Sequence, residues 1–196
     1  MARETVRDEV LGRYVEFLGR PAEAWTYDDM PGAGPRRIEV LAFAPSEPGD
    51  VWRYVTLGMS SLPMPGLAET THRVELMLYA YEQHAQLPDV LAGLASYPFV
   101  TGAHLDAGHT IAGTPGEGVV PGSPLTEFLF TPLYFEDDRL RQFPLSDGTH
   151  VTLLWATPIY LTERRYALEH GWTRLVEGPF TEQEVEPGDL WRAAAV

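Results

Sequence analysis

The 196-residue sequence contains no cysteine and no lysine, so all 14 basic residues are arginines. The absence of cysteine excludes disulfides, thiolate zinc sites and a thiol nucleophile. The absence of lysine excludes Schiff-base chemistry, a lysine general base and the phosphate-binding lysine of a P-loop. Composition alone therefore rules out several classes of enzyme.

Long apolar segments are also missing. No apolar run approaches the roughly 20 residues that a membrane-spanning helix needs. Residues 1–19 alternate charged and apolar side chains, unlike the apolar core of a signal peptide. We therefore expect a cytoplasmic protein that does not insert into membranes.

Positive charge is scarce, because 28 acidic residues oppose the 14 arginines and give a formal net charge of -14. Such a chain repels nucleic-acid phosphates and anionic lipid headgroups, so we expect neither as a partner. The same charge attracts basic proteins and speeds their encounter. Solubility is the simpler explanation of an acidic surface, and attraction of a basic partner is the functional one.

What is present is typical of one packed domain spanning residues 1–196, since hydrophobic residues make up 44% of the chain. Helical spacing of apolar residues predicts helices over 5–18, 88–97 and 162–170. Runs rich in β-branched and aromatic residues predict strands over 38–44, 51–58, 72–81, 127–133 and 150–157. Thr5 and Asp8 form a candidate capping pair for the first helix.

The order of these elements indicates the fold class. Only some strand pairs are separated by a helix, which favours an α+β fold with a mixed, largely antiparallel sheet and helices packed on it. Segments 20–36 and 101–124, rich in glycine and proline, are expected to be long irregular connections. Pro98 is expected to end the second helix, and alternation along the third strand places Glu75 on a solvated face.

His104, Asp106 and His109 are the strongest enzymatic candidate, because imidazole and carboxylate groups can bind a divalent metal. Their spacing matches no established ligand signature, and histidines in such a loop can equally form ordinary hydrogen bonds. A small metal-dependent hydrolase is the enzymatic alternative that they suggest. The glycines of 113–118 form no dinucleotide-binding fingerprint, so we expect no cofactor.

Acidic and aromatic residues also suggest a binding surface. Adjacent acids in polar turns are usually solvated rather than catalytic, and aromatic residues dominate interface energetics although most of them are core residues. The candidate partner-binding residues are Asp106, His109, Glu136, Asp137, Asp138, Tyr79 and Tyr81. We predict no catalytic residue and no metal ligand among them.

Six segments of the chain form an ordered pattern. They are Tyr54–Ser60, Arg73–Leu78, Leu91–Phe99, Gly108–Ile111, Asp147–Leu154 and Pro158–Gly171. In this order and spacing they resemble the Suppressor of Fused domain family, over roughly residues 50–178 and in the form of a single-domain bacterial member. The resemblance implies a helix-and-sheet sandwich without a known catalytic site.

In animals, relatives of this domain form the N-terminal half of a two-domain protein that clamps a peptide of a zinc-finger transcription factor. This chain resembles one half only, so no peptide-contact residue is transferred. Animal members also carry an acidic residue beside the histidine at this point, where this sequence has Gly108, His109 and Thr110. Single-domain bacterial members are associated with immunity proteins that neutralise toxins. The resemblance therefore implies a non-catalytic protein-binding domain, and a basic toxin is the partner that it suggests. The alternatives are the metal-dependent hydrolase and a regulatory domain that associates with itself.

Overall fold

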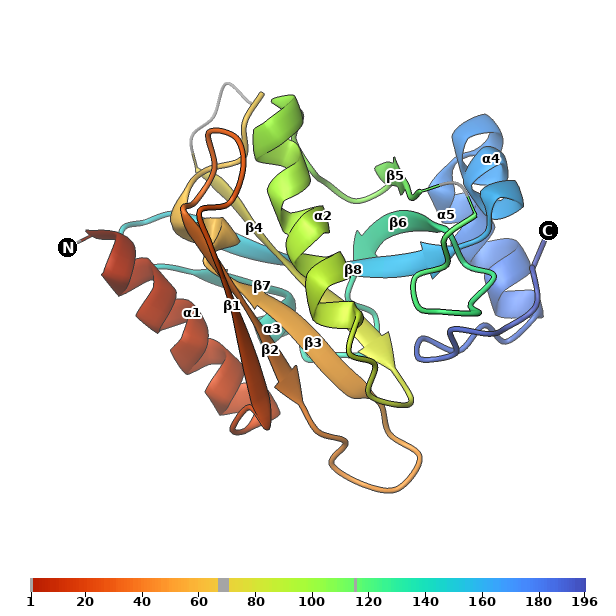
Figure 1. The fold of residues 1–196 in the computed structure, drawn as a ribbon, viewed down its shortest axis with the longest axis horizontal. Helices are drawn as coiled ribbons and strands as arrows, with labels where there is room; N and C mark the ends of the chain where they lie inside the picture. Colours follow the sequence, from red (N-terminus) through yellow and green to blue (C-terminus); the bar gives the residue numbers. More distant parts are fainter. Residues whose placement is uncertain (1, 67–70, 115) are drawn as a thin grey trace.

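A single eight-stranded sheet organises the computed structural model, which describes residues 2–66, 71–114 and 116–196 (Figure 1). Along the sheet the strand order is β1-β2-β3-β4-β8-β6-β5, and β7 pairs with β8 beside this path. The strands are β1 Glu23–Asp28, β2 Arg37–Phe43, β3 Trp52–Leu57, β4 His72–Ala80, β5 Thr110–Ala112, β6 Glu127–Pro132, β7 Gln142–Pro144 and β8 His150–Ile159.

The pairing is antiparallel throughout these strands except between β4 and β8, which run parallel. A parallel pair cannot be joined by a tight hairpin, and here the chain between β4 and β8 passes through two helices and three strands before it returns. The predicted α+β fold with a mixed, largely antiparallel sheet is confirmed.

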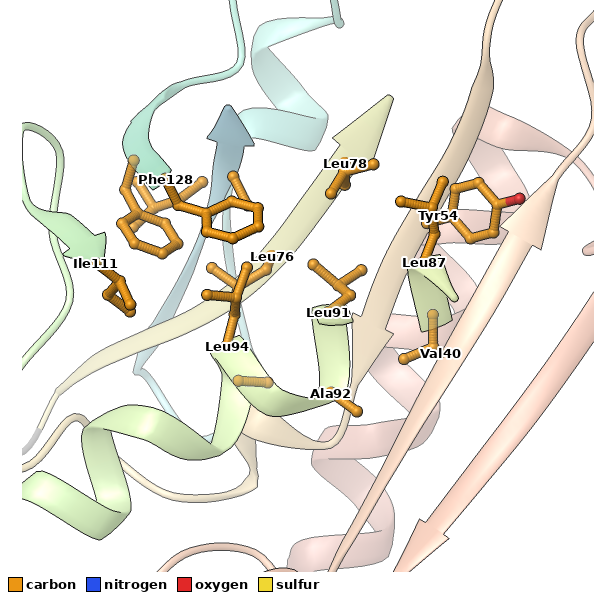
Figure 2. Close-up of a cluster of buried hydrophobic side chains, with 14 of the residues drawn as sticks. Val40, Tyr54, Leu76, Leu78, Leu87, Leu91, Ala92, Leu94, Ile111 and Phe128 are labelled. Carbon is orange, nitrogen blue, oxygen red and sulfur yellow. The ribbon is translucent and has the colours of Figure 1, made fainter. Parts of the chain in front are cut away.

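One face of the sheet is covered by α2, Leu87–Thr101, which crosses β2, β3 and β4 (Figure 1). Leu87, Leu91 and Leu94 follow helical spacing and point into a cluster with Val40 and Leu76 of the sheet (Figure 2). The helix continues through Pro98, where the sequence predicts its end, and stops at Gly102. Pro98 and Phe99 are both buried, and a proline inside a helix removes one backbone hydrogen bond.

The opposite face is covered by α1, Ala2–Leu18, together with the short helix α3, Asp138–Arg141, and β7. Val10 and Tyr14 of α1 are fully buried against Met77 of β4 and its neighbours. Both faces of β4 are therefore dry, and the expectation of a solvated face is wrong. The helix begins at Ala2, so Thr5 lies within it rather than at its N-terminus.

A third apolar cluster joins the far end of the sheet to the C-terminal helices α4, Leu161–His170, α5, Trp172–Leu175, and the π-helical turn η2, Val176–Phe180. The last helix of the prediction ends at Gly171 as expected. The sequence does not reveal β1 inside segment 20–36, β5 inside 101–124, or the 3-10 turn η1, Met59–Ser61. None of the described helices is long and apolar enough to cross a membrane.

Candidate protein-interaction surface

The loop that carries His104, Asp106 and His109 joins α2 to β5. His109 Nδ1 lies 3.1 Å from the carbonyl oxygen of His104, and the two imidazole rings pack edge to face with centroids 4.8 Å apart. The Asp106 carboxylate accepts a hydrogen bond from the Ala107 N–H at 2.7 Å. Among the described residues, no group of three or more histidine, aspartate or glutamate side chains can hold a metal ion, so this loop gives the hydrolase alternative no ligand set.

The acidic turn at 136–138 is bound within the fold rather than left free. Glu136 accepts a hydrogen bond from Arg53 Nε at 2.7 Å. Asp137 caps α3 by accepting from the Arg139 N–H at 2.8 Å, and its ion pair with the Arg139 side chain lowers its pKa to about 2. Asp138 is largely exposed and pairs with Arg141 at 2.9 Å.

The two predicted tyrosines have different surroundings. Tyr79 is 1% exposed, and its hydroxyl donates to Glu136 at 3.1 Å. Burial, followed by the Glu136 charge, raises the pKa of Tyr79 far above its usual value. Tyr81 is 39% exposed, and its hydroxyl bonds to Glu186 at 2.5 Å, which raises its pKa to about 12.

The predicted partner-binding residues therefore occupy three distinct sets of contacts. Tyr79 and Glu136 touch each other, and the adjacent Asp137 and Asp138 belong to the same turn. Tyr81 is bound to the C-terminal segment through Glu186, and His109 is bound to the loop after α2. Their assignment to one interface stays a prediction.

A buried carboxylate that the sequence places on a solvated face is instead at the centre of the fold. Glu75 is fully buried and accepts four hydrogen bonds, from the Thr56 hydroxyl, the Gly58 N–H, and the N–H and hydroxyl of Ser60. Burial raises the pKa of Glu75, and these four donors oppose the rise. The prediction for Glu75 is wrong because alternation identifies the shared face but not what covers it.

Strand β5 is the last strand in the sheet order, so one of its edges is unpaired within the described structure. Beside it lies a groove of about 290 Å³ between α2 and the segment that follows β5. Asp89 and Glu117 supply negative charge to the walls, and Tyr97, 41% exposed, supplies an aromatic ring. An open strand edge next to a groove can receive an extended chain by adding it to the sheet.

Comparison with protein families assigns residues 34–193 to the suppressor of fused protein, SUFU. The chain belongs to the SUFU family. The match covers most of the chain, and it confirms the resemblance that the six sequence segments indicate. No curated protein sequence matches the chain.

Solved structures show the same SUFU fold at low sequence identity. A SUFU homologue from Neisseria gonorrhoeae is 22% identical with a TM-score of 0.75, and the match covers 97% of both chains. A chain of a Sufu–Fu complex is 13% identical with a TM-score of 0.71, covering 97% of this chain and 92% of the other. Drosophila Suppressor of Fused is 14% identical with a TM-score of 0.65, covering 98% of this chain and 50% of that longer chain.

Proposed function

We propose that this SUFU chain is a non-catalytic protein-binding domain that receives an extended segment of a partner along the free edge of β5. The observation that carries the proposal is this open edge beside an acidic groove. Support comes from the family, since one protein of the same fold has been solved in complex with a protein, Fu. As a single domain in the cytoplasm, the chain would act through its surface alone.

The backbone geometry of β5 favours strand addition. Phe130 exchanges hydrogen bonds with Gly108 and His109, at 2.7 and 2.9 Å. Bonded and non-bonded pairs alternate along an antiparallel ladder, so the next bonded pair is Ile111 with Phe128. By the same alternation, the N–H and C=O groups of Thr110 and Ala112 point outward and are free for a partner strand.

The negative charge of the chain favours a basic protein as its partner. The net charge of -14 and the acidic groove walls favour a basic segment and oppose nucleic acid. We propose a toxin neutralised by this chain as an immunity protein, because carboxylates presented to a basic nuclease occupy the position of its substrate phosphates. Binding of this kind should weaken as ionic strength rises.

The test is to co-express the chain with the proteins encoded beside its gene and to measure the affinity of any complex. We expect Ala112→Pro to weaken binding about tenfold, because it removes one outward N–H, and Glu117→Arg to weaken it by a similar factor. Glu182→Arg, the same charge change at an exposed position outside the groove, is the matched control. Binding unaffected by Ala112→Pro and by salt would contradict the proposal, and so would pairing of β5 with a second copy of the chain.

A further inference from the structure

A second groove, of about 330 Å³, lies on the other face of the sheet from the β5 groove. Trp155 of β8 belongs to the apolar cluster on the α1 side, whereas Ile111 and Phe128 of the β5 groove belong to the cluster on the α2 side. The walls of the second groove come from the turn after β6, from β8, and from η2 with the residues that follow it. We call it the aromatic groove, because Tyr134, Phe135, Trp155 and Phe180 line it.

Two of these rings are unusually open to solvent. Phe135 is 58% exposed and Tyr134 is 44% exposed, although they are adjacent in the sequence and both line the groove. Phe135 packs edge to face on Trp155 with centroids 5.6 Å apart. Adjacent exposed aromatic rings around a hollow are typical of a surface that another molecule covers.

The indole of Trp155 is a second, independent sign of a ligand. The side chain is 6% exposed, and within the described part of the chain its Nε1–H has no hydrogen-bond partner. Buried polar groups in folded proteins are nearly always paired, so an unpaired donor on a residue that lines the groove needs an explanation. The Nε1 atom itself is enclosed, so a ligand in the groove would have to shift the surroundings of Trp155 to supply the missing acceptor.

Uncompensated charge at the aromatic groove is negative. Glu184 lines the groove. Burial raises the pKa of Tyr134, and the nearby charge of Glu177 adds to this rise. Neither glutamate forms an ion pair with any described arginine.

Two arginines near the aromatic groove are already paired with carboxylates. Arg192, stacked 5.0 Å from the Phe180 ring centroid, is bound to Glu163 at 2.6 Å. Arg141, near Tyr134, pairs with Asp138 at 2.9 Å. These two arginines are therefore engaged elsewhere, and a cationic ligand would complement the charge of Glu184.

We infer that the aromatic groove binds a partner segment in which an arginine side chain sits among the aromatic rings beside Glu184, with an apolar neighbour packed on Phe135. A guanidinium stacks on aromatic faces and is weakly hydrated, so it suits a groove that combines π-faces with a carboxylate. This site does not depend on the β5 edge, and it extends the proposed function with a second contact on the opposite face.

The probe is the peptide acetyl-Leu-Arg-Leu-amide, titrated into ¹⁵N-labelled protein and followed by NMR. The indole N–H resonance of Trp155 is identified by its loss in Trp155→Phe, among the five tryptophans of the chain. We expect a saturable shift of this resonance. The same peptide with neutral citrulline in place of arginine should bind about fivefold more weakly, because the cation–π and carboxylate contacts are lost.

Variants of the protein locate the site. Phe135→Ala should weaken peptide binding about tenfold, and Glu184→Gln about threefold. Val100→Ala is the matched control, because Val100 is 55% exposed on α2, away from the aromatic groove, and it should leave binding unchanged. Glu184 is exposed, so Glu184→Gln keeps the test decisive if Phe135→Ala fails to fold.

Three results would overturn the inference. They are equal binding of the arginine and citrulline peptides, a peptide shift that leaves the Trp155 resonance in place, and a dimer that forms through Phe135 and excludes the peptide. The β5 variant Ala112→Pro should bind this peptide normally. Loss of peptide binding would therefore count against the aromatic groove alone, and loss of the partner complex in Ala112→Pro concerns the β5 edge alone.

Discussion

Glu75 and Trp155 are buried polar residues on the same side of neighbouring strands, yet their surroundings differ. Glu75 of β4 has four hydrogen-bond donors around one carboxylate. Trp155 of β8, paired in register with Met77 of β4, has a donor for which the described residues provide no acceptor. A satisfied buried group holds a fold together, whereas an unsatisfied one lowers stability unless a ligand completes it.

The Glu75 site connects β4 with the continuous segment formed by the end of β3, Gly58 and η1. Its donors come from β3, from Gly58 and from η1, and the Thr56 hydroxyl in turn accepts from the Leu76 N–H at 2.8 Å. Gly58 has φ 115°, and a Cβ there would lie 2.9 Å from the Arg37 carbonyl oxygen, so glycine is required for the turn that aims these donors. The Trp155 site has no comparable network, and its neighbours Tyr134 and Phe135 remain open to solvent.

The largest effect is expected from Glu75→Ala. Removal of the carboxylate leaves several buried donors without a partner and should lower the free energy of unfolding by about 3–5 kcal/mol. Urea denaturation measures the loss. Glu75→Gln, which retains the shape and one accepting oxygen, is the control and should cost less. A loss below about 1 kcal/mol for Glu75→Ala would show that the network does not stabilise the fold.

A smaller effect is expected from Trp155→Phe. The substitution removes an unpaired donor together with part of a buried ring, so the two changes oppose each other and the net loss should be about 1 kcal/mol. Thermal unfolding of the variant beside Glu75→Ala gives the comparison directly. A loss as large as that of Glu75→Ala would mean that the Trp155 N–H has a partner in solution.

The smallest expected effect is on how stability changes at acidic pH. Hydrogen bonds from Arg53 hold the pKa of Asp50 well below its usual range, so this stabilisation is present above about pH 4 and is lost as the pH falls further. The raised pKa of Glu75 has the opposite sign, because its site is most stable when the carboxyl is protonated and loses stability as the pH rises through that pKa.

Thermal unfolding from neutral pH down to about pH 2, compared between the protein and Asp50→Asn, isolates the contribution of Asp50. Asp50→Asn should reduce the stability lost on acidification by about 1 kcal/mol or less, because partly exposed ion pairs are weak. If Asp50→Asn loses as much stability at acidic pH as the unchanged protein, the Asp50–Arg53 pair does not contribute to the acid dependence.

The elements that the sequence predicts well are those whose partners are apolar. The runs that became β2, β3, β4, β6 and β8 are found within one or two residues of their predicted bounds, because long β-branched and aromatic runs have a strong strand preference. The exposed strand β1 and the three-residue strands β5 and β7 were missed, since each depends on a neighbouring strand more than on its own residues. The aromatic groove was missed for a related reason, because its rings come from three separate parts of the chain.

The sequence by itself determined the fold class, the family and the acidic character of the chain, because these follow from composition and from the order of local patterns. Tertiary structure alone decided that Glu75 is buried, that Glu136 is bound to Arg53, and that, among the described residues, one edge of β5 is unpaired and the buried Trp155 donor lacks an acceptor. The physical reason is that burial and hydrogen-bond satisfaction depend on which distant segments cover a residue. Local periodicity in the sequence does not show which distant segments pack over a residue.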